Sequence, residues 1–348
     1  MALVPITAGS LQTAAEIILA GGLVAFPTET VYGLGGDAFN SAALARIFEA
    51  KGRPRFDPLI IHIADLEGLD RIARLEALDG EARNKLETIC KNLWPGPLTV
   101  ILPKRPEVPD LATSGLPTAA VRLPSHPAAR ELIRLSAGAV AAPSANPFGR
   151  LSPTRAEHVL AGLGDKVDII LDGGRCGVGL ESTVLDLSGG GAMPRILRPG
   201  GVSREQIEAL IGPVAVQGAM TGATTERPLS PGQLLSHYAP GTALYLHSPA
   251  EMILLKPEKD EGYLFFDDSS RNRWADGAAS GTALTNSVNI RSLSAVGNTI
   301  EAAANLFETL HDMDRMGLRL IHAEKAPDEG LGPAINDRLG RAAIRRSE

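Results

Sequence analysis

The sequence has few cysteines, and it lacks both a signal-peptide pattern and an apolar run long enough to cross a bilayer. Its two cysteines, Cys90 and Cys176, form no Cys-x-x-Cys pair, which argues against a zinc site and against a disulfide framework. A membrane-spanning helix needs about 20 apolar residues. Residues 1–5 also lack the charged-then-apolar order of a signal peptide. We therefore expect a cytoplasmic protein with no membrane segment.

Aromatic residues and positive charge are also scarce. Only 4% of the residues are aromatic and the formal net charge is −6. A strong non-specific grip on nucleic acid needs a broad basic surface, which this charge disfavours, although a local basic pocket is still allowed. Aliphatic residues must build the core, which suits buried strands covered by helices. A chain of 348 residues exceeds one ordinary core, so two domains are expected.

Short apolar, β-branched segments alternate with helical patterns in the first part of the chain. This alternation indicates an α/β domain, but it is too irregular for a purely parallel sheet. The predicted strands are Leu23–Phe26, Leu59–Ile63, Leu98–Leu102, Ala119–Leu123, Ala139–Ala142, Val167–Leu171 and Val184–Leu187. The predicted helices are Leu11–Ala20, Ser41–Ala50, Asp65–Arg74, Glu81–Lys91, Pro127–Leu135 and Pro153–Leu160.

Local signals mark several helix ends. Gly52 follows Lys51 where the helix from Ser41 should stop. Ser152 precedes a proline, as an N-cap residue before the first helical position does. Ser203 is expected to cap a helix over Arg204–Ile211.

The composition changes after this last helix. Gly, Thr, Ala and Pro dominate without apolar periodicity, which is typical of a linker. We therefore predict a catalytic domain at 1–212, a linker at 213–240 and a smaller α/β domain at 241–348. The elements expected in the smaller domain are strands Ala243–Leu246, Gly262–Phe266, Ser287–Leu293 and Leu318–Ala323 and helices Thr299–Met316 and Pro333–Arg345; the apolar face of the first helix comprises Ile300, Ala304, Phe307, Leu310 and Met313.

A basic segment is the first candidate for an anion site. The chain lacks the Gly-x-x-x-x-Gly-Lys-Ser/Thr pattern of a P-loop, and Gly33–Gly36 does not fit a dinucleotide fingerprint. In an extended segment, Lys51, Arg53 and Arg55 would point the same way and present three cations to phosphate. A solvated basic loop is an equally good interpretation of this segment alone.

A second polar segment directly follows an apolar strand. Ser144 and Asn146 share one side if the backbone is extended, and they offer a hydroxyl and an amide to phosphate, ribose or a base. Ser152 follows shortly, at the start of a helix whose free N–H groups favour an anion. A turn followed by an ordinary cap would also explain the segment.

Two polar residues interrupt buried strands. His62 lies in an otherwise apolar strand, where a hydrogen-bonded core histidine is the usual interpretation. Arg122 also lies in a predicted buried strand, where a cation needs an anionic partner. If no protein carboxylate pairs with Arg122, a substrate carboxylate would.

Eight ordered motifs together resemble the YrdC-type threonylcarbamoyl-AMP synthases in their two-domain form. The resemblance is dense over about residues 10–240, and Ser230-Pro-Gly-Gln and His237-Tyr-Ala-Pro look like that family's linker. The motifs are Phe26-Pro-Thr-Glu-Thr-Val-Tyr-Gly-Leu-Gly, Lys51-Gly-Arg-Pro, Pro58-Leu-Ile-Ile-His-Ile, Trp94-Pro-Gly-Pro-Leu-Thr, Val121-Arg-Leu-Pro, Ala142-Pro-Ser-Ala-Asn, Gly179-Leu-Glu-Ser-Thr-Val and Ile196-Leu-Arg-Pro-Gly.

The resemblance implies a twisted mixed sheet flanked by helices, a small Rossmann-like C-terminal domain, and a nucleotidyltransferase activity. The family condenses L-threonine, bicarbonate and ATP into threonylcarbamoyl-AMP and releases pyrophosphate. A downstream complex then transfers the threonylcarbamoyl group to an adenosine beside the tRNA anticodon. Carried over by motif, the ATP contacts are Lys51, Arg53, Asp57, Thr118, Ser144, Asn146, Ser152, Arg198 and Tyr238, with Lys51 and Arg53 also catalytic, and the threonine contacts are Thr30, His62, Arg122, Ala142 and Ser182.

One position departs from the family pattern. Many members carry Asn where this chain has Asp57, and a carboxylate would repel phosphates unless it faces ribose, adenine or a metal ion. Mg²⁺ is expected to arrive with ATP, because no protein metal cage is apparent. The linker would form a lid over the site, with Tyr238 touching the nucleotide, or it would be a passive tether.

Two other functions compete with this hypothesis. One is a double-stranded-RNA-binding module without catalysis, which the acidic charge and the few aromatics disfavour, although weak RNA binding is compatible with the basic pocket. The other is a carbamoyl-adenylate enzyme that uses carbamoyl phosphate. Proteins of that kind normally carry zinc-finger and acylphosphatase-like regions that this chain lacks.

Overall fold

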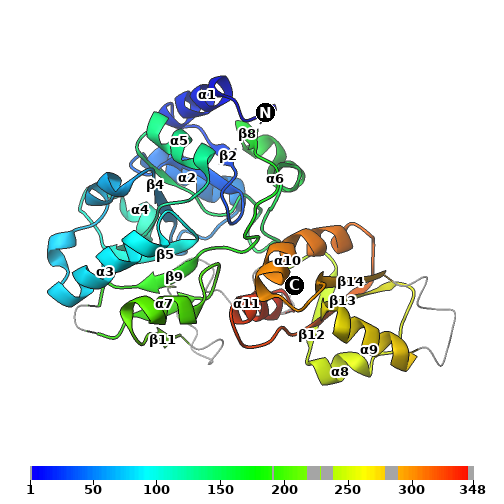
Figure 1. Cartoon of the computed structure of the whole chain (residues 1–348). Coiled ribbons are helices and arrows are strands. Elements are labelled where there is room, and N and C mark those ends of the chain that lie inside the picture. Colours follow the sequence, from blue (N-terminus) through cyan, green and yellow to red (C-terminus); the bar gives the residue numbers. More distant parts are fainter. Residues whose placement is uncertain (1, 190–191, 218–227, 229–237, 279–288, 344–348) are drawn as a thin grey trace. The chain divides into compact units, whose positions relative to one another are not determined.

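The computed structural model describes residues 2–189, 192–217, 228, 238–278 and 289–343. The chain divides into two compact units, one formed by Met1–Phe148 and Ser152–Leu234 and the other by Gly149–Leu151 and Leu235–Glu348 (Figure 1). Within the described part, none of the helices has the length and apolar character that a membrane crossing requires. Most of the predicted linker, residues 218–227 and 229–237, lies outside the described residues. The hypothesis that the linker forms a lid concerns these residues and stays a prediction.

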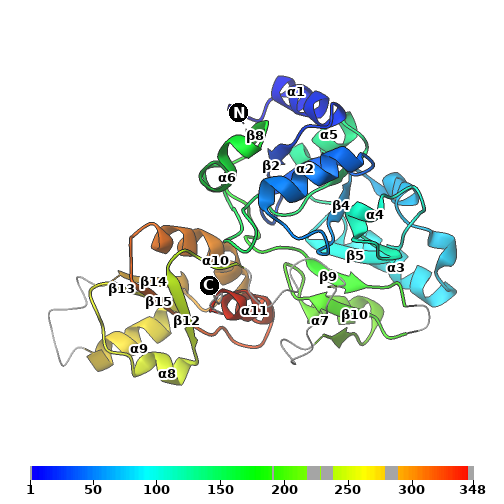
Figure 2. The same cartoon turned by 180° about the vertical axis from the view of Figure 1, so that it is seen from behind.

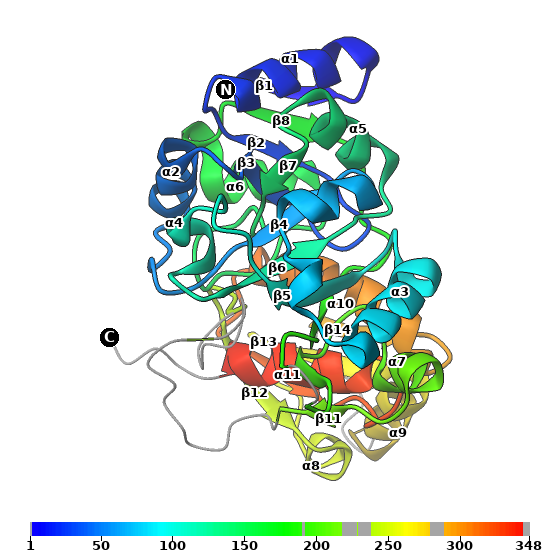
Figure 3. The same cartoon turned by 90° about the vertical axis from the view of Figure 1, so that its left-hand side faces the viewer.

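The first unit is built on one mixed sheet, which confirms the predicted fold class. Its described residues form eleven strands, and parallel and antiparallel neighbours alternate along much of the sheet. Figure 3 shows the succession from β1 at one edge through β2 and β4 to β5. In spatial order the strands are β1 (Ala2–Pro5), β8 (Ile169–Asp172), β2 (Val24–Phe26), β3 (Gly33–Asp37), β7 (Ala139–Ala141), β4 (Ile60–Ile63), β6 (Thr118–Arg122), β5 (Leu98–Pro103), β9 (Thr183–Asp186), β10 (Arg195–Arg198) and β11 (Ala215–Val216).

Helices cover both faces of this sheet. On one face, α1 (Ala8–Leu19) and α5 (Pro127–Leu135) pack side by side over a small apolar cluster. On the other face lies the main core, and there α2 and α4 are neighbours (Figure 2). The helices that contribute to this core are α2 (Ser41–Lys51), α3 (Gly80–Leu93), α4 (Asp110–Thr113), α6 (Ala156–Leu163) and α7 (Arg204–Ile211).

Side-chain alternation sends polar groups away from the main core. Ile61 and Ile63 of β4 belong to that core, so His62 between them points to the opposite face. By the same alternation, Thr99 and Arg122 project from β5 and β6 to the face that carries His62, and the register places both His62 and Thr99 opposite Arg122. Three polar side chains from adjacent strands therefore meet on one face.

Several sequence predictions need correction. Asp65–Arg74 is not an α-helix: only Leu66–Arg71 is helical, as a 3₁₀ segment that Asp65 caps. The sequence did not indicate a strand at Gly33–Gly36, yet these residues lie within β3, which pairs with β2 and β7. Ser152 does not cap a helix, because α6 begins at Ala156 after Arg155.

Other boundary predictions are confirmed. Gly52 ends α2 in the left-handed region at φ 62°, as the glycine after a helix often does. Ser203 caps α7 in a capping box with Gln206. The start of the predicted linker differs, since Ala215–Val216 form a short strand that pairs in parallel with β10.

The second unit is a smaller α/β fold with a four-stranded parallel sheet in the described residues. Its strand order is β12 (Ala243–His247), β15 (Leu320–Glu324), β13 (Glu261–Asp267) and β14 (Asn289–Ser294). Its helices are α8 (Pro249–Ile253), α9 (Asp268–Ala278), α10 (Thr299–Asp314) and α11 (Gly332–Ala343). The sequence did not indicate α8 and α9. The predicted face of α10 was partly wrong, because Ile300 is 65% exposed while Ala302, Ala303 and Leu306 are buried.

Candidate active site

Lys51 is the last residue of α2, and its buried ammonium group is held by backbone carbonyls. Its Nζ donates to the carbonyl of Ser144 at 2.5 Å and to the carbonyl of Asn146. The backbone N–H of Phe148 in turn donates to the carbonyl of Lys51 at 2.8 Å. The two segments that the sequence proposed separately as anion sites are thus joined, but through backbone oxygens and not through the Ser144 and Asn146 side chains.

Arg53 is oriented by the turn that follows it. Its Nε donates to the carbonyl of Asp57 at 3.1 Å, and its Nη2 donates to the carbonyl of Pro58 at 2.7 Å. The same Nη2 forms an ion pair with Oδ2 of Asp57 at 2.9 Å, with both side chains buried. The carboxylate that departs from the family pattern is therefore the internal counter-ion of Arg53.

Burial strongly affects the protonation of this cationic group. Burial and then the neighbouring Arg53 lower the pKa of Lys51 well below its ordinary value. Burial raises the pKa of Asp57, and the charges of Arg53, Lys51 and Arg198 oppose that effect. Crowded cations that lose water gain most from a polyanion, so this environment suits a phosphate chain.

Arg198 supplies a third buried cation and joins the two halves of the site. Its Nη2 donates to the carbonyl of Ser182 at 2.8 Å and contacts Oγ of the same residue at 3.2 Å. Oγ of Ser182 lies 2.7 Å from Oγ1 of Thr99. Ser182 thus contacts both the cationic group and the polar face that carries Thr99.

Arg122 has a protein carboxylate as its partner. Its Nη2 lies 2.7 Å from Oε1 of Glu29, and its Nη1 donates to Oγ1 of Thr30 at 2.9 Å. Thr30 in turn shares a hydrogen bond with Thr28 at 2.8 Å. Arg122 therefore does not need a substrate carboxylate as its only anionic partner, as the sequence had left open. A substrate carboxylate that binds Arg122 would share this guanidinium with the carboxylate of Glu29.

His62 is a neutral imidazole in this environment. Burial, and then the charge of Arg122, lower the pKa of His62 to about 3. Its ring meets the ring of Phe26 edge-on at 6.5 Å. A neutral imidazole can accept a hydrogen bond from a hydroxyl or donate one to it, and it adds no charge beside Arg122.

Several buried polar atoms around Arg53 and Arg122 have no hydrogen-bond partner of acceptable distance and angle. They include both carboxylate oxygens of Glu29 and of Asp57, Nδ1 of His62, Nη2 of Arg122 and Nδ1 of His126. Glu29 and Asp57 do have ion-pair partners, but at angles that make no hydrogen bond. Since buried polar groups are normally satisfied, such a concentration marks a place where a ligand supplies the missing partners.

The remaining predicted residues are placed as follows. Thr118 begins β6, Ala142 is buried and donates its N–H to Ile60, and Ser144 is half-buried beside Gly33. Ser152 is fully buried, and its hydroxyl donates to the carboxylate of Glu181. Tyr238 belongs to the second unit, where its ring packs 5.7 Å from that of Phe307 and beneath the guanidinium of Arg338.

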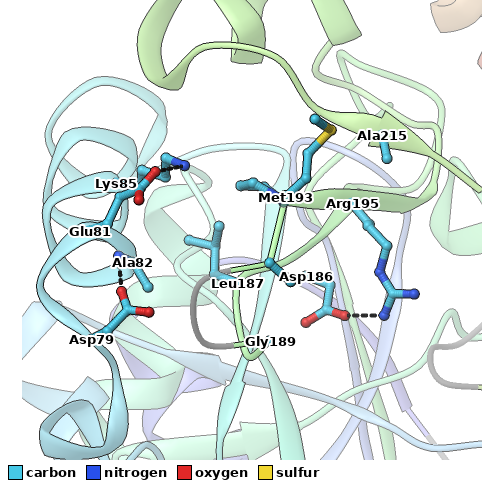
Figure 4. A pocket seen from close by; sticks show the side chains of 12 residues that line it. Asp79, Glu81, Ala82, Lys85, Asp186, Leu187, Gly189, Met193, Arg195 and Ala215 are labelled. Carbon is cyan, nitrogen blue, oxygen red and sulfur yellow. Dashed lines mark hydrogen bonds and ion pairs between the residues drawn. The ribbon is translucent and has the colours of Figure 1, made fainter.

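A separate pocket of about 420 Å³ lies between the start of α3 and the β9–β10 hairpin (Figure 4). Its charged side chains are already paired, Lys85 with Glu81 at 2.6 Å and Arg195 with Asp186 at 3.0 Å. Asp79 caps α3 through the N–H of Ala82. Because its charges satisfy one another, this pocket offers a ligand less than the buried group around Arg53 and Arg122 does.

The sequence did not single out Glu29, Thr99 or His126. Glu29 and Thr99 stand inside the quoted motifs, and the signal that could have found them is a polar residue at a strand end or on the face of Arg122. His126 precedes the proline that begins α5. Its pKa is lowered by burial and raised by the charge of Glu29, which places the imidazole and the carboxylate near each other.

Comparisons with known proteins agree over nearly the whole chain. A family described as Sua5_yciO_yrdC, Telomere recombination, matches residues 16–200, and one described as Threonylcarbamoyl-AMP synthase, C-terminal domain, matches residues 202–344. The chain is 42% identical to the threonylcarbamoyl-AMP synthase of Pyrococcus abyssi, over 96% of this chain and 94% of that protein. It is also 42% identical to the threonylcarbamoyl-AMP synthase of Bacillus subtilis, over 96% and 92%.

A solved structure gives the same result. The crystal structure of P. abyssi Sua5 complexed with L-threonine matches with a TM-score of 0.82 and 38% sequence identity. The match covers 98% of this chain and 96% of that one.

Proposed function

The chain belongs to the threonylcarbamoyl-AMP synthase family, and on that premise we propose that its first unit makes threonylcarbamoyl-AMP from L-threonine, bicarbonate and ATP. It is an enzyme that forms an adenylate, a nucleotidyltransferase. The observation that carries the proposal is the continuity at Ser182, which contacts Arg198 on one side and Thr99 on the other. One buried site thus offers cations for a nucleotide and polar groups for an amino acid.

The nucleotide's phosphates would bind Lys51, Arg53 and Arg198. Backbone carbonyls hold all three cations in place before a ligand arrives, so little side-chain entropy is lost on binding. Preorganised cations in a buried site stabilise the charge that develops as pyrophosphate leaves. Thr118, Ser144, Asn146 and Ser152 are assigned to the rest of the nucleotide, and the resemblance to the family adds Tyr238.

The amino acid would bind on the face that carries Arg122. Thr30, His62 and Ser182 supply neutral hydrogen-bonding groups, and the backbone at Ala142 supplies a further contact. Thr30 is already linked to Arg122 at 2.9 Å, so one substrate can contact both.

The reaction needs positioning more than it needs a protein nucleophile. The threonine amine combines with bicarbonate to give a carbamate, and water leaves. A carbamate oxygen then attacks the α-phosphorus, the bond from that phosphorus to the β-phosphate oxygen breaks, and pyrophosphate departs. The protein's tasks are to orient three substrates, neutralise the phosphates and keep water from the labile carbamate.

A divalent cation would come with the nucleotide. In the described residues, no cluster of three or more His, Cys, Asp or Glu side chains could hold a metal ion. Mg²⁺ is commonly bound by substrate phosphates with one or two carboxylates. Asp57 fits as that carboxylate, since its buried oxygens accept no directed hydrogen bond.

A pyrophosphate-release assay tests the proposal. Release should require ATP, L-threonine and bicarbonate together, should not require RNA, and should accompany an adenylate of the mass of threonylcarbamoyl-AMP. Release that ignores threonine, or that needs RNA, would contradict the proposal. The product would supply a downstream complex that modifies adenosine beside the anticodon of tRNA, and addition of unmodified tRNA should leave the initial rate unchanged.

A further inference from the structure

Glu29 is a carboxylate beside Arg122, in the candidate amino-acid site, and its buried oxygens accept no hydrogen bond. We propose that Glu29 binds the α-ammonium group of the amino-acid substrate and, with Arg122, recognises the zwitterion. The proposal rests on the proposed function, because it presumes an amino-acid substrate.

The position of Glu29 follows from both of its chain neighbours. Thr28 and Thr30 are buried and share a hydrogen bond, which fixes the backbone around Glu29. The carbonyl of Glu29 accepts from the N–H of Val178 at 2.7 Å. Its side chain is 13% exposed and ends 2.7 Å from Arg122. The carboxylate is thus held inside the site and does not extend into solvent.

The pairing with Arg122 does not satisfy this carboxylate. Neither Oε1 nor Oε2 of Glu29 accepts a directed hydrogen bond, and Nη2 of Arg122 donates none. A purely structural buried ion pair needs good geometry and further hydrogen bonds to offset the cost of losing water. Arg122 satisfies its other nitrogens, donating from Nη1 to Thr30 and from Nε to the carbonyl of Gly96. The atoms left without hydrogen bonds are therefore the two carboxylate oxygens of Glu29 and the adjacent Nη2 of Arg122.

An amino acid fits these two charges. Its ammonium carries three N–H donors and its carboxylate carries only acceptors, which complements an unsatisfied carboxylate beside an unsatisfied guanidinium nitrogen. The charge of Glu29 also acts on His126, and Nδ1 of that imidazole is buried without a hydrogen bond. A hydroxy acid would offer Glu29 one neutral O–H donor in place of three charged N–H donors, which disfavours its binding.

A set of ligands tests the proposal on the unaltered protein. Calorimetry should show that L-threonine binds about 10- to 100-fold more tightly than 2,3-dihydroxybutanoate, which carries a hydroxyl in place of the ammonium, because a hydrogen-bonded charge is lost. Equal affinities for the two ligands would overturn the role of Glu29. If the protein bound no L-threonine at all, the proposed function itself would fail.

The variant Glu29→Gln separates direct binding from positioning. L-Threonine should bind about 10- to 100-fold more weakly to the variant, while the affinities for ATP and for 2,3-dihydroxybutanoate stay unchanged. Equal weakening of L-threonine and the hydroxy acid would mean that Glu29 only positions Arg122, and would refute the proposal. Glu131→Gln on α5 is the matched control, since its carboxylate is 40% exposed and pairs with Arg134. If Glu29→Gln fails to fold, the ligand comparison on the unaltered protein still decides.

Discussion

The two units each contain a cluster of buried charged groups, and the clusters differ in whether their hydrogen bonds are complete. In the second unit, Oε2 of Glu261 lies 3.0 Å from Nε2 of His322 and 3.0 Å from the hydroxyl of Tyr263. Nδ1 of His322 lies 2.9 Å from Nε2 of His247. Arg319 pairs with the other oxygen of Glu261. The groups of this cluster therefore supply one another's hydrogen bonds and ion pairs.

The cluster in the first unit does not. Glu29, Asp57 and His62 retain buried atoms without directed partners, although the cations beside them are held by carbonyls. In the second unit, Oγ of Ser292 and Nη2 of Arg338 are also buried without a hydrogen bond, but both lie outside the Glu261–His322 cluster, and Arg338 pairs with Asp337 through its Nη1. The comparison teaches that charge and burial alone do not identify a ligand site: an incomplete set of hydrogen bonds distinguishes a site from a structural network.

The largest effect is expected for Arg53→Ala. The variant removes a preorganised cation from the phosphates and should lower kcat by about 100- to 1,000-fold. It also leaves Asp57 buried without its counter-ion, which should lower the free energy of unfolding by about 3–5 kcal/mol. Initial rates and thermal unfolding measure the two effects separately. Near-normal turnover would remove Arg53 from catalysis.

A second substitution distinguishes these two consequences. Adding Asp57→Asn to Arg53→Ala removes the orphaned charge, so the double variant should regain much of the stability but none of the activity. If stability stayed low in the double variant, the Arg53–Asp57 ion pair would not be the cause of the loss.

The next largest effect is expected in the satisfied cluster. His322→Phe keeps a ring against Tyr263, whose ring lies 5.1 Å away, but removes two hydrogen bonds and leaves Glu261 and His247 each short of a partner. The second unit should lose about 2–4 kcal/mol of stability, while activity well below the unfolding temperature is retained. Lys259→Gln, at an exposed position of the same unit, is the control. A strong loss of activity in folded His322→Phe would break the contrast between the clusters.

Much of this fold could be predicted from periodicity, because β4, β5 and β6 are apolar runs and α2 ends at a glycine. The motifs also brought Lys51, Arg53 and Ser144 together. What could not be predicted is the direction of backbone carbonyls: the sequence offered the Ser144 side chain to a ligand, and it gave no sign that the Ser144 carbonyl accepts from Lys51. Ser152 carried a cap signal, yet tertiary structure uses its hydroxyl for the carboxylate of Glu181. Local patterns do not show such long-range partners.

A smaller effect concerns proton uptake at Lys51. Because burial and Arg53 lower the pKa of its amine in the ligand-free protein, part of the protein lacks this proton at alkaline pH. Bound phosphates favour the charged form, so ATP binding should take up a fraction of a proton at alkaline pH. Calorimetry in buffers of different ionisation enthalpy measures this uptake. In Lys51→Arg, whose guanidinium does not titrate, the uptake should fall to near zero. Uptake as large as in the unaltered protein would assign the proton to another group.

The smallest effect tests whether the satisfied cluster depends on pH. Burial, and then the charge of His322, lower the pKa of His247 below its ordinary value of 6.5, and Glu251 opposes this. The unfolded chain therefore binds more protons, so the contribution to stability is complete above pH 6.5 and is lost as the pH falls through that value.

Because His247 is partly exposed, the change should stay below about 1 kcal/mol between about pH 7.5 and about pH 5.5. Hydrogen exchange at the amides of β12 and β15, corrected for the intrinsic rate, measures it. Protection should fall in acid in the unaltered protein and change less in His247→Asn. Protection that rises in acid would reverse the sign. Equal losses in both proteins would mean that His247 is not the group responsible.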